Sequence, residues 1–155
     1  MRRRDKEIKD KKTIQWILKE ALVCRIALCQ DNKPYIIPMN FGFKDKCLYL
    51  HSAAEGRKID ILKENKNICF EMDIKTQIVK SENACSWGMK YYSVIGSGKA
   101  LFIEDKSEKK KILDIIMQKY SENDTKSFEY SKSALDKTTV IKVEITEITG
   151  KQSGY

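Results

Sequence analysis

Residues 49–65 read YLHSAAEGRKIDILKEN, and this stretch joins the end of a predicted strand to the start of a predicted helix. The apolar run ends at His51, the only histidine of the chain. A turn of small residues follows, and Arg57 and Lys58 then stand on the first turn of the helix, predicted over 57–65. Backbone N–H groups at a helix N-terminus carry partial positive charge, so a cation there costs about 0.3–1 kcal/mol.

A bound phosphate would reverse the sign of that cost, because the amides, the guanidinium and the ammonium would all attract it. Gly56 would allow close approach of the backbone, and Ser52 would supply a hydroxyl. The stretch therefore predicts a phosphate site. The alternative is that both cations simply extend into water.

The composition is that of one soluble globular domain covering residues 1–155. The chain has 41% hydrophobic and 34% charged residues, so it is not disordered. No segment approaches the roughly 20 apolar residues of a membrane span. The start, MRRRDKEIKDKK, runs into no apolar signal core. We therefore expect a cytoplasmic protein with no membrane contact.

A net charge of +8 can reflect binding of nucleic acid, binding of an anionic ligand, or simply a basic surface in contact with water. Because the lysines are mixed with acids and no nucleic-acid-binding motif is present, we expect no nucleic-acid partner. The five cysteines are scattered and form no C-x-x-C pair, which argues against a zinc site or a disulfide framework. We expect no metal, and we expect buried, reduced thiols.

The first half of the chain predicts a helix and a β-meander. Asp10 or Thr13 can cap a helix over 11–21. Strands are predicted over 22–30, 35–43 and 47–52, joined by short turns, with Pro38 at a sheet edge or a bulge because it lacks an N–H.

The second half predicts strands over 67–79, 91–105 and 138–148, and a helix over 106–120 capped by Asp105. Gly96 and Gly98 indicate a bulge or a close approach, and 80–90 is a candidate ligand loop. About six antiparallel strands and three helices make a mainly β protein. The natural class is a β-barrel or sandwich with peripheral helices.

Four segments carry a resemblance to a known superfamily. They are LVCRIALCQDNKPYIIPMNFGF (22–43), CLYLHSAAEGRKIDILKENKNICFEMD (47–73), CSWGMKYYSVIGSGKALFIED (85–105) and EITEITGK (144–151). In this order and spacing they resemble the FMN-binding split-barrel superfamily related to pyridoxamine 5'-phosphate oxidase, and more closely its branch with the nitroimidazole-resistance proteins. The likeness runs nearly end to end.

The resemblance implies a homodimer with FMN at the subunit interface and the flavin phosphate on the Gly-Arg-Lys turn. Its implied cofactor-binding residues are Pro38, Met39, Asn40, Phe41, Leu50, His51, Ser52, Ala53, Gly56, Arg57, Lys58, Trp87 and Ser93. Among these, Trp87 and Ser93 would contact the flavin ring or the partner chain. For Trp87, the alternative is a packing residue in an irregular loop.

His51 is the implied catalytic residue. An imidazole titrates near neutrality, so it can donate a hydrogen bond to the flavin or a proton to a reduced substrate. The alternative is a histidine that only finishes a strand.

The resemblance implies an FMN-dependent reductase of small aromatic or nitro compounds, with electrons from NAD(P)H or from a redox protein. One alternative is a flavin-binding or sensing module without turnover, and another is haem binding in the same barrel with His51 as ligand. True pyridoxamine 5'-phosphate oxidases carry an arginine-rich substrate site near the C-terminus, whereas this chain has no arginine after Arg57. Oxidation of vitamin B6 phosphates is therefore not expected.

Overall fold

The fold was analysed in a computed structural model that describes residues 3–121 and 128–155. In these residues the strands are β1 (Glu7–Ile8), β2 (Cys24–Gln30), β3 (Lys33–Met39), β4 (Phe41–Lys44), β5 (Cys47–Ala53), β6 (Asn67–Val79), β7 (Gly88–Ile103) and β8 (Thr138–Ser153). The α-helices are α1 (Lys11–Glu20), α2 (Arg57–Glu64), α3 (Lys106–Tyr120) and α4 (Lys132–Lys137), and two 3-10 turns are η1 (Arg4–Lys6) and η2 (Ala84–Ser86).

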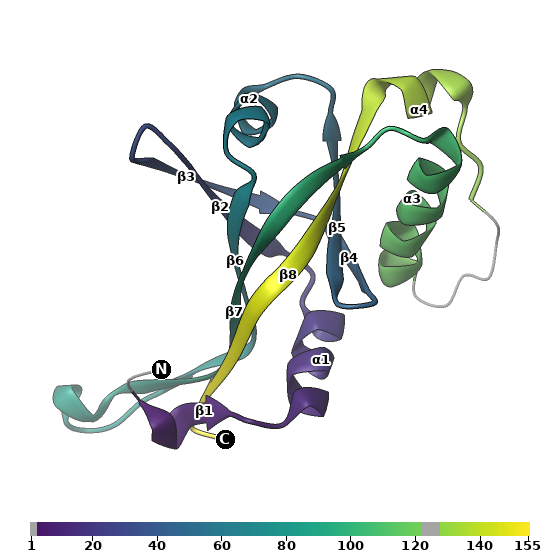
Figure 1. The fold of residues 1–155 in the computed structure, drawn as a ribbon. Coiled ribbons are helices and arrows are strands. Elements are labelled where there is room, and N and C mark those ends of the chain that lie inside the picture. Colours follow the sequence, from purple (N-terminus) through teal and green to yellow (C-terminus); the bar gives the residue numbers. More distant parts are fainter. Residues whose placement is uncertain (1–2, 122–127) are drawn as a thin grey trace.

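The eight strands of the described residues form one antiparallel sheet in the order β3-β2-β6-β7-β8-β5-β4, with β1 paired to β8. Figure 1 shows β8 crossing the middle of the molecule, with α2 at one end of the curled sheet and α1 near the other. The predicted mainly β fold with peripheral helices is confirmed, with eight strands where the sequence indicated about six.

The predicted caps of the two longer helices are present. The Asp10 carboxylate accepts hydrogen bonds from the Lys12 and Thr13 amides at 3.2 and 2.8 Å, so Asp10 is the cap of α1. The Asp105 carboxylate accepts one from the Glu108 amide at 2.8 Å at the start of α3. These bonds satisfy amides that a helix leaves without an internal partner, and they explain why both helices begin where they do.

The predicted single strand over 35–43 is wrong, because the chain breaks at Asn40 into β3 and β4. β3 pairs with β2, and β4 pairs with β5 at the opposite end of the strand order. The predicted meander is therefore two separate hairpins. At the break, the Phe41 amide donates to the Tyr120 hydroxyl at 3.0 Å, so a side chain from α3 takes the place of a strand partner. The predicted edge position of Pro38 is confirmed, because β3 is the edge strand.

The main core lies between the inner face of the sheet and the helices α1 and α2. On α2 the buried residues are Ile59, Ile61 and Leu62, which fix this short helix against the sheet while Arg57 stays exposed. A second, smaller apolar cluster lies under α3, around Ile112, Leu113 and Ile116. Thus α2 packs over β2, and α3 packs over β4 and β5.

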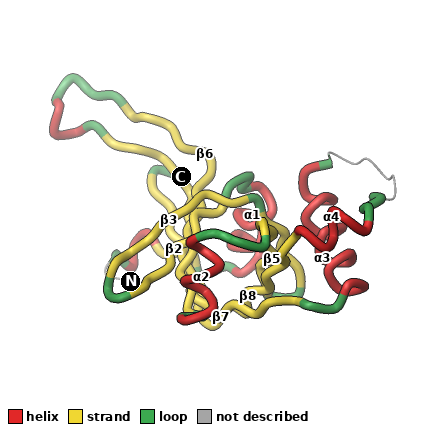
Figure 2. The backbone as a smooth tube through the Cα atoms, turned by 90° about the horizontal axis from the view of Figure 1, so that it is seen from above, coloured by secondary structure: helices red, strands yellow, loops and turns green. Residues whose placement is uncertain are grey.

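The hairpin of β6 and β7 projects from the body of the molecule, as Figures 1 and 2 show from two directions. Where β7 returns to the body, a side chain at Gly96 would collide with the ring of Phe70. The pairing of β7 with β8 shifts register between Ser97 and Gly98. The predicted close approach and bulge at these glycines are confirmed.

The five cysteines are free, but the prediction that they are buried holds only for Cys24. Cys29, Cys69 and Cys85 are exposed and Cys47 is half-buried. The alternation along each strand explains the difference, since Cys24 points into the core whereas Cys29 and Cys69 lie on the outer face. Within the described residues, no helix has the length and apolar character needed to cross a membrane.

Candidate functional site

The start of α2 presents backbone amides without a side-chain cap. Gly56 is the N-cap residue, with φ 118° and ψ 165°, a conformation that essentially only glycine adopts. Its carbonyl accepts hydrogen bonds from the Ile59 and Asp60 amides at 2.8 and 3.2 Å, which closes the first helical turn. Within residues 3–121 and 128–155, no side chain accepts a hydrogen bond from this turn at the cap. The outermost amides are therefore available to an anion.

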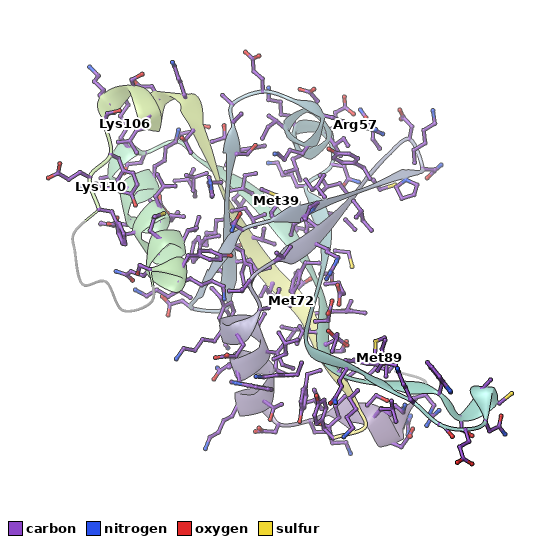
Figure 3. The ribbon with its side chains drawn as sticks, turned by 180° about the vertical axis from the view of Figure 1, so that it is seen from behind. Met39, Arg57, Met72, Met89, Lys106 and Lys110 are labelled. Atoms are coloured by element: carbon purple, nitrogen blue, oxygen red, sulfur yellow. The ribbon has the colours of Figure 1, made fainter. Side chains whose placement is uncertain are left out.

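Arg57 lies beside the β2–β3 hairpin. Its guanidinium carbon is 4.6 Å from the ring centroid of Tyr35 in β3, a cation–π contact that orients the side chain. Figure 3 labels Arg57 where α2 faces this hairpin. Sequence reasoning did not identify Tyr35, because the contact depends on how two segments 22 residues apart meet in space.

The charge of Lys58, on the first turn of α2, acts on the imidazole of His51 near the end of β5. Partial burial lowers the pKa of His51, and the positive charge of Lys58 lowers the same pKa further. Part of the His51 side chain remains open to solvent. At pH 7 the imidazole is thus mainly neutral, a form that can either donate or accept a hydrogen bond.

Three predicted site residues on β4 and β5 turn their side chains inward. Phe41 and Leu50 are buried in the core and face each other across the β4–β5 ladder. Ser52 is also buried, and its hydroxyl donates to the Ala53 carbonyl at 3.0 Å. Phe41 and Leu50 can therefore reach a ligand only through their backbone, and Ser52 would have to rotate first.

The segment between the two hairpins is more open. Pro38 and Asn40 are exposed, while Met39 is half-buried against the core, as Figure 3 shows for Met39 near the centre of the molecule. Ala53 is exposed at the end of β5, three residues before Gly56. The fold therefore joins Ala53, Gly56, Arg57, Lys58 and His51 along one continuous strand–turn–helix.

Trp87 and Ser93 are not part of this group within one chain. The indole N–H of Trp87 donates to the Ser81 carbonyl at 2.7 Å, and the ring is half-exposed on the projecting hairpin. Ser93 is half-buried in β7, opposite Asp73 of β6. Figures 1 and 3 show this hairpin and α2 at opposite ends of the molecule. The predicted ligand loop 80–90 contains the turn η2 and the first residues of β7.

The described residues hold no group of three or more His, Cys, Asp or Glu side chains placed to bind a metal ion. What the α2 start offers is instead a set of donors: free amides, a guanidinium, an ammonium and a nearby neutral imidazole. Such a set suits a phosphate group.

A family model and one relative show the family of this chain, and further solved structures show its fold. The family model described as pyridoxamine 5'-phosphate oxidase matches residues 10–152. A candidate 5-nitroimidazole antibiotic resistance protein from Bacteroides thetaiotaomicron is 38% identical, with a TM-score of 0.83 over 94% of this chain and 86% of that one. No curated protein sequence matches significantly.

Two larger proteins share the fold at lower identity. The FAD and heme binding protein from Mycobacterium smegmatis has a TM-score of 0.87 at 18% identity, over 97% of this chain and 74% of that one. The flavocytochrome Anf3 from Azotobacter vinelandii has a TM-score of 0.86 at 20% identity, over 100% of this chain and 72% of that one.

Proposed function

Because this chain belongs to the pyridoxamine 5'-phosphate oxidase family of split-barrel proteins, we propose that it binds FMN and reduces small aromatic compounds such as nitroimidazoles. The observation that carries the proposal is the start of α2. There, uncapped amides, Arg57 and Lys58 converge next to the only histidine. The 38% identity to the candidate nitroimidazole resistance protein supports the choice of substrate class.

The chain's own residues have distinct tasks in this proposal. The amides after Gly56, with Arg57 and Lys58, hold the phosphate, and Tyr35 keeps the guanidinium in place. The exposed backbone near Asn40 and the end of β5 provides amides and carbonyls for the edge of the ring. The bound flavin would supply the electron chemistry.

His51 would act on protons. Its lowered pKa keeps it mainly neutral at pH 7, so it can hold a hydrogen bond to the ring. To donate a proton to the reduced substrate it would first take one up from solvent, and the transfer would return it to the neutral form. We expect His51→Ala to retain flavin but to slow nitro reduction, since general acid–base catalysis contributes about 10²–10⁴-fold. Unchanged turnover would remove His51 from the reaction.

We also propose that two copies of the chain associate. The projecting β6–β7 hairpin carries exposed Ile78, Trp87 and Met89, which are far from α2 in their own chain. In a homodimer these residues would contact the partner, and Trp87 and Ser93 would reach the partner's flavin. Size-exclusion chromatography with light scattering tests this, because a monomer at micromolar concentration would contradict it.

The decisive experiment is a titration of the purified protein with FMN and with FAD, followed by reduction with NADH, NADPH or dithionite. A nitroimidazole is then added, and recovery of the oxidised flavin spectrum is measured. If the oxidised flavin spectrum recovers no faster than in the enzyme-free control, the protein is a flavin-binding module without turnover. Uptake of haem, recognised by a Soret band, would favour the alternative suggested by the names of the two larger proteins.

A further inference from the structure

The last turn of α3 holds the point where the chain crosses from β3 to β4. The Tyr120 hydroxyl accepts a hydrogen bond from the Phe41 amide at 3.0 Å and donates one to the Leu22 carbonyl at 2.8 Å. One phenol oxygen thus joins the α1–β2 connection to the first residue of β4. The two bonded groups are 98 and 79 residues from Tyr120 in the chain.

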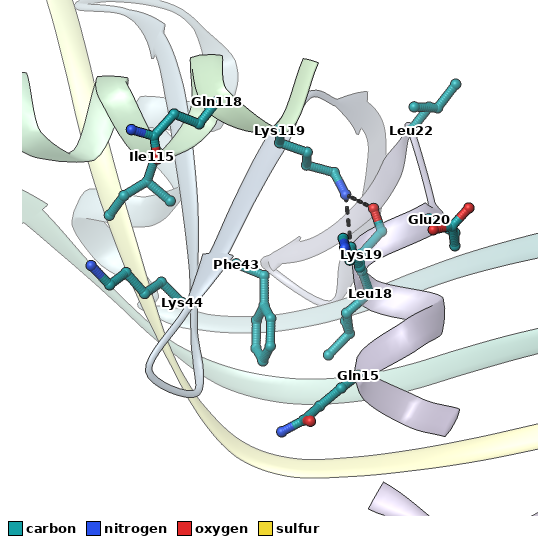
Figure 4. A pocket seen from close by; sticks show the side chains of 10 residues that line it. All are labelled: Gln15, Leu18, Lys19, Glu20, Leu22, Phe43, Lys44, Ile115, Gln118 and Lys119. Carbon is teal, nitrogen blue, oxygen red and sulfur yellow. Dashed lines mark hydrogen bonds between the residues drawn. The ribbon is translucent and has the colours of Figure 1, made fainter. Parts of the chain in front are cut away.

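The neighbouring residue, Lys119, fixes the same turn to α1. Its ammonium donates to the Leu18 and Lys19 carbonyls at 2.9 and 2.6 Å, as the dashed lines of Figure 4 mark. It also lies 4.4 Å from the ring centroid of Phe41. Burial lowers the pKa of Lys119 to about 8, although Glu20 and Cys24 oppose this shift. The ammonium satisfies carbonyls that the end of α1 leaves without partners.

α3 is also seated directly on the backbone of β4. A Cβ atom built on Gly42 would lie 2.9 Å from Ile115 Cγ2 and 3.2 Å from the Ile116 nitrogen. Only a residue without a side chain permits this approach. The Tyr120 hydroxyl therefore has little freedom to move relative to Phe41.

We propose that Tyr120 is a positioning residue, whose hydroxyl sets the Asn40–Phe41 backbone along which the flavin ring lies. The inference rests on the proposed function, which assigns this exposed crossing to the edge of the ring. Phe41 pairs with Leu50, and His51 is the next residue of β5. A shift of Phe41 would thus move both backbone segments that face the ring.

Tyr130 provides a matched control. It packs against the same apolar cluster under α3, and its buried hydroxyl faces the Asp114 carboxylate of α3 rather than the point where the chain crosses from β3 to β4. Tyr120→Phe and Tyr130→Phe remove the same atom from two tyrosines near α3. Only the first atom touches the crossing.

The experiment compares wild type, Tyr120→Phe and Tyr130→Phe by amide hydrogen exchange at Phe41 and by visible circular dichroism of the bound flavin. Loss of one hydrogen bond should speed exchange at Phe41 roughly five- to tenfold in Tyr120→Phe. The flavin dichroism should change in that variant alone. If Tyr120→Phe fails to fold, 3-fluorotyrosine at position 120 alters the strength of the same hydrogen bonds while keeping the shape.

The proposal would be overturned if the Phe41 amide exchanged at similar rates in Tyr120→Phe and Tyr130→Phe. Similar rates in the protein with 3-fluorotyrosine at position 120 and in the wild type would overturn it too. Faster exchange with an unaltered flavin spectrum would overturn it as well, because Tyr120 would then hold the crossing without positioning the ring. If the wild-type protein takes up no flavin, the proposed function fails. The exchange rates would still decide whether Tyr120 holds the crossing.

Discussion

Two helices of this molecule each begin with a pair of cations but have opposite caps. α1 starts with Asp10-Lys11-Lys12, and α2 starts with Gly56-Arg57-Lys58. At α1 the Asp10 carboxylate takes two amide hydrogen bonds and places a negative charge beside the lysines. At α2 the glycine brings no side chain and its φ is 118°.

The difference teaches that a cation pair at a helix start is not itself a binding signal. At the start of α1 the Asp10 carboxylate is the anion, and it already occupies the Lys12 and Thr13 amides. In α2, no side chain of the described residues caps the amides, while buried Ile59, Ile61 and Leu62 hold the helix firmly. An anion from outside would complete α2 as Asp10 completes α1.

The largest expected effect is the loss of flavin from the α2 start. Each charge-assisted hydrogen bond contributes about 1.5–3 kcal/mol, so Arg57→Ala with Lys58→Ala should weaken FMN binding by at least about 100-fold. Fluorescence titration measures the affinity. Lys11→Ala with Lys12→Ala is the matched control and should bind FMN as the wild type does. Equal losses of FMN affinity in the two double variants would contradict the proposal that α2, and not α1, binds the phosphate.

The next largest effect concerns the backbone at Gly56. A Cβ there would meet no atom within 4 Å, so the whole effect of Gly56→Ala comes from its positive φ. A residue forced into this region costs about 1–3 kcal/mol. Urea unfolding without flavin should show that loss of stability. A variant as stable as the wild type would mean that the turn relaxes freely.

Removing the cap of α1 should cost less and should leave the ligand site alone. Asp10→Ala is expected to reduce the free energy of unfolding by about 1 kcal/mol, as for other N-caps. FMN affinity should stay unchanged, because Asp10 does not belong to the α2 start. A large loss of flavin in this variant would contradict the separation of the two sites.

The smallest effect is a change in the titration of His51. Because Lys58 lowers the pKa of His51, Lys58→Ala should raise it, and the single histidine gives an unambiguous NMR signal. A pKa that stays the same or falls would contradict the coupling.

The same shift predicts a pH dependence of stability. The folded pKa of His51 is below its ordinary value, so between the two the unfolded chain binds more protons. Stability should therefore fall as pH drops through this window. The loss should be smaller in Lys58→Ala.

Much of the fold could be predicted because its signals are local. Asp10 and Asp105 mark two helix starts, and alternation marks β6 over the predicted residues 67–79. The break at Asn40 could not be predicted, since the apolar pattern continues across it. At the break the two segments pair with different strands, and the Phe41 amide bonds to the hydroxyl of Tyr120, 79 residues away in the chain.

In the candidate site, too, the residues close together in sequence could be predicted and the long-range contacts could not. Gly56, Arg57, Lys58 and His51 are close in sequence, so one motif revealed them together. Tyr35 was missed because only tertiary packing brings it to Arg57. Sequence position also could not reveal that Ser52 donates to its neighbour's carbonyl, or that the hairpin carrying Trp87 projects away from α2.

The place of β8 in the sheet has a consequence for synthesis on the ribosome. β8 lies between β7 and β5, so it links two groups of strands that otherwise share no pairing, β3-β2-β6-β7 and β5-β4. It is also translated after the other seven strands. The nascent polypeptide therefore cannot join the two half-sheets through β8 until residues 138–153 have left the exit tunnel, and a chain truncated before them would have an unclosed sheet.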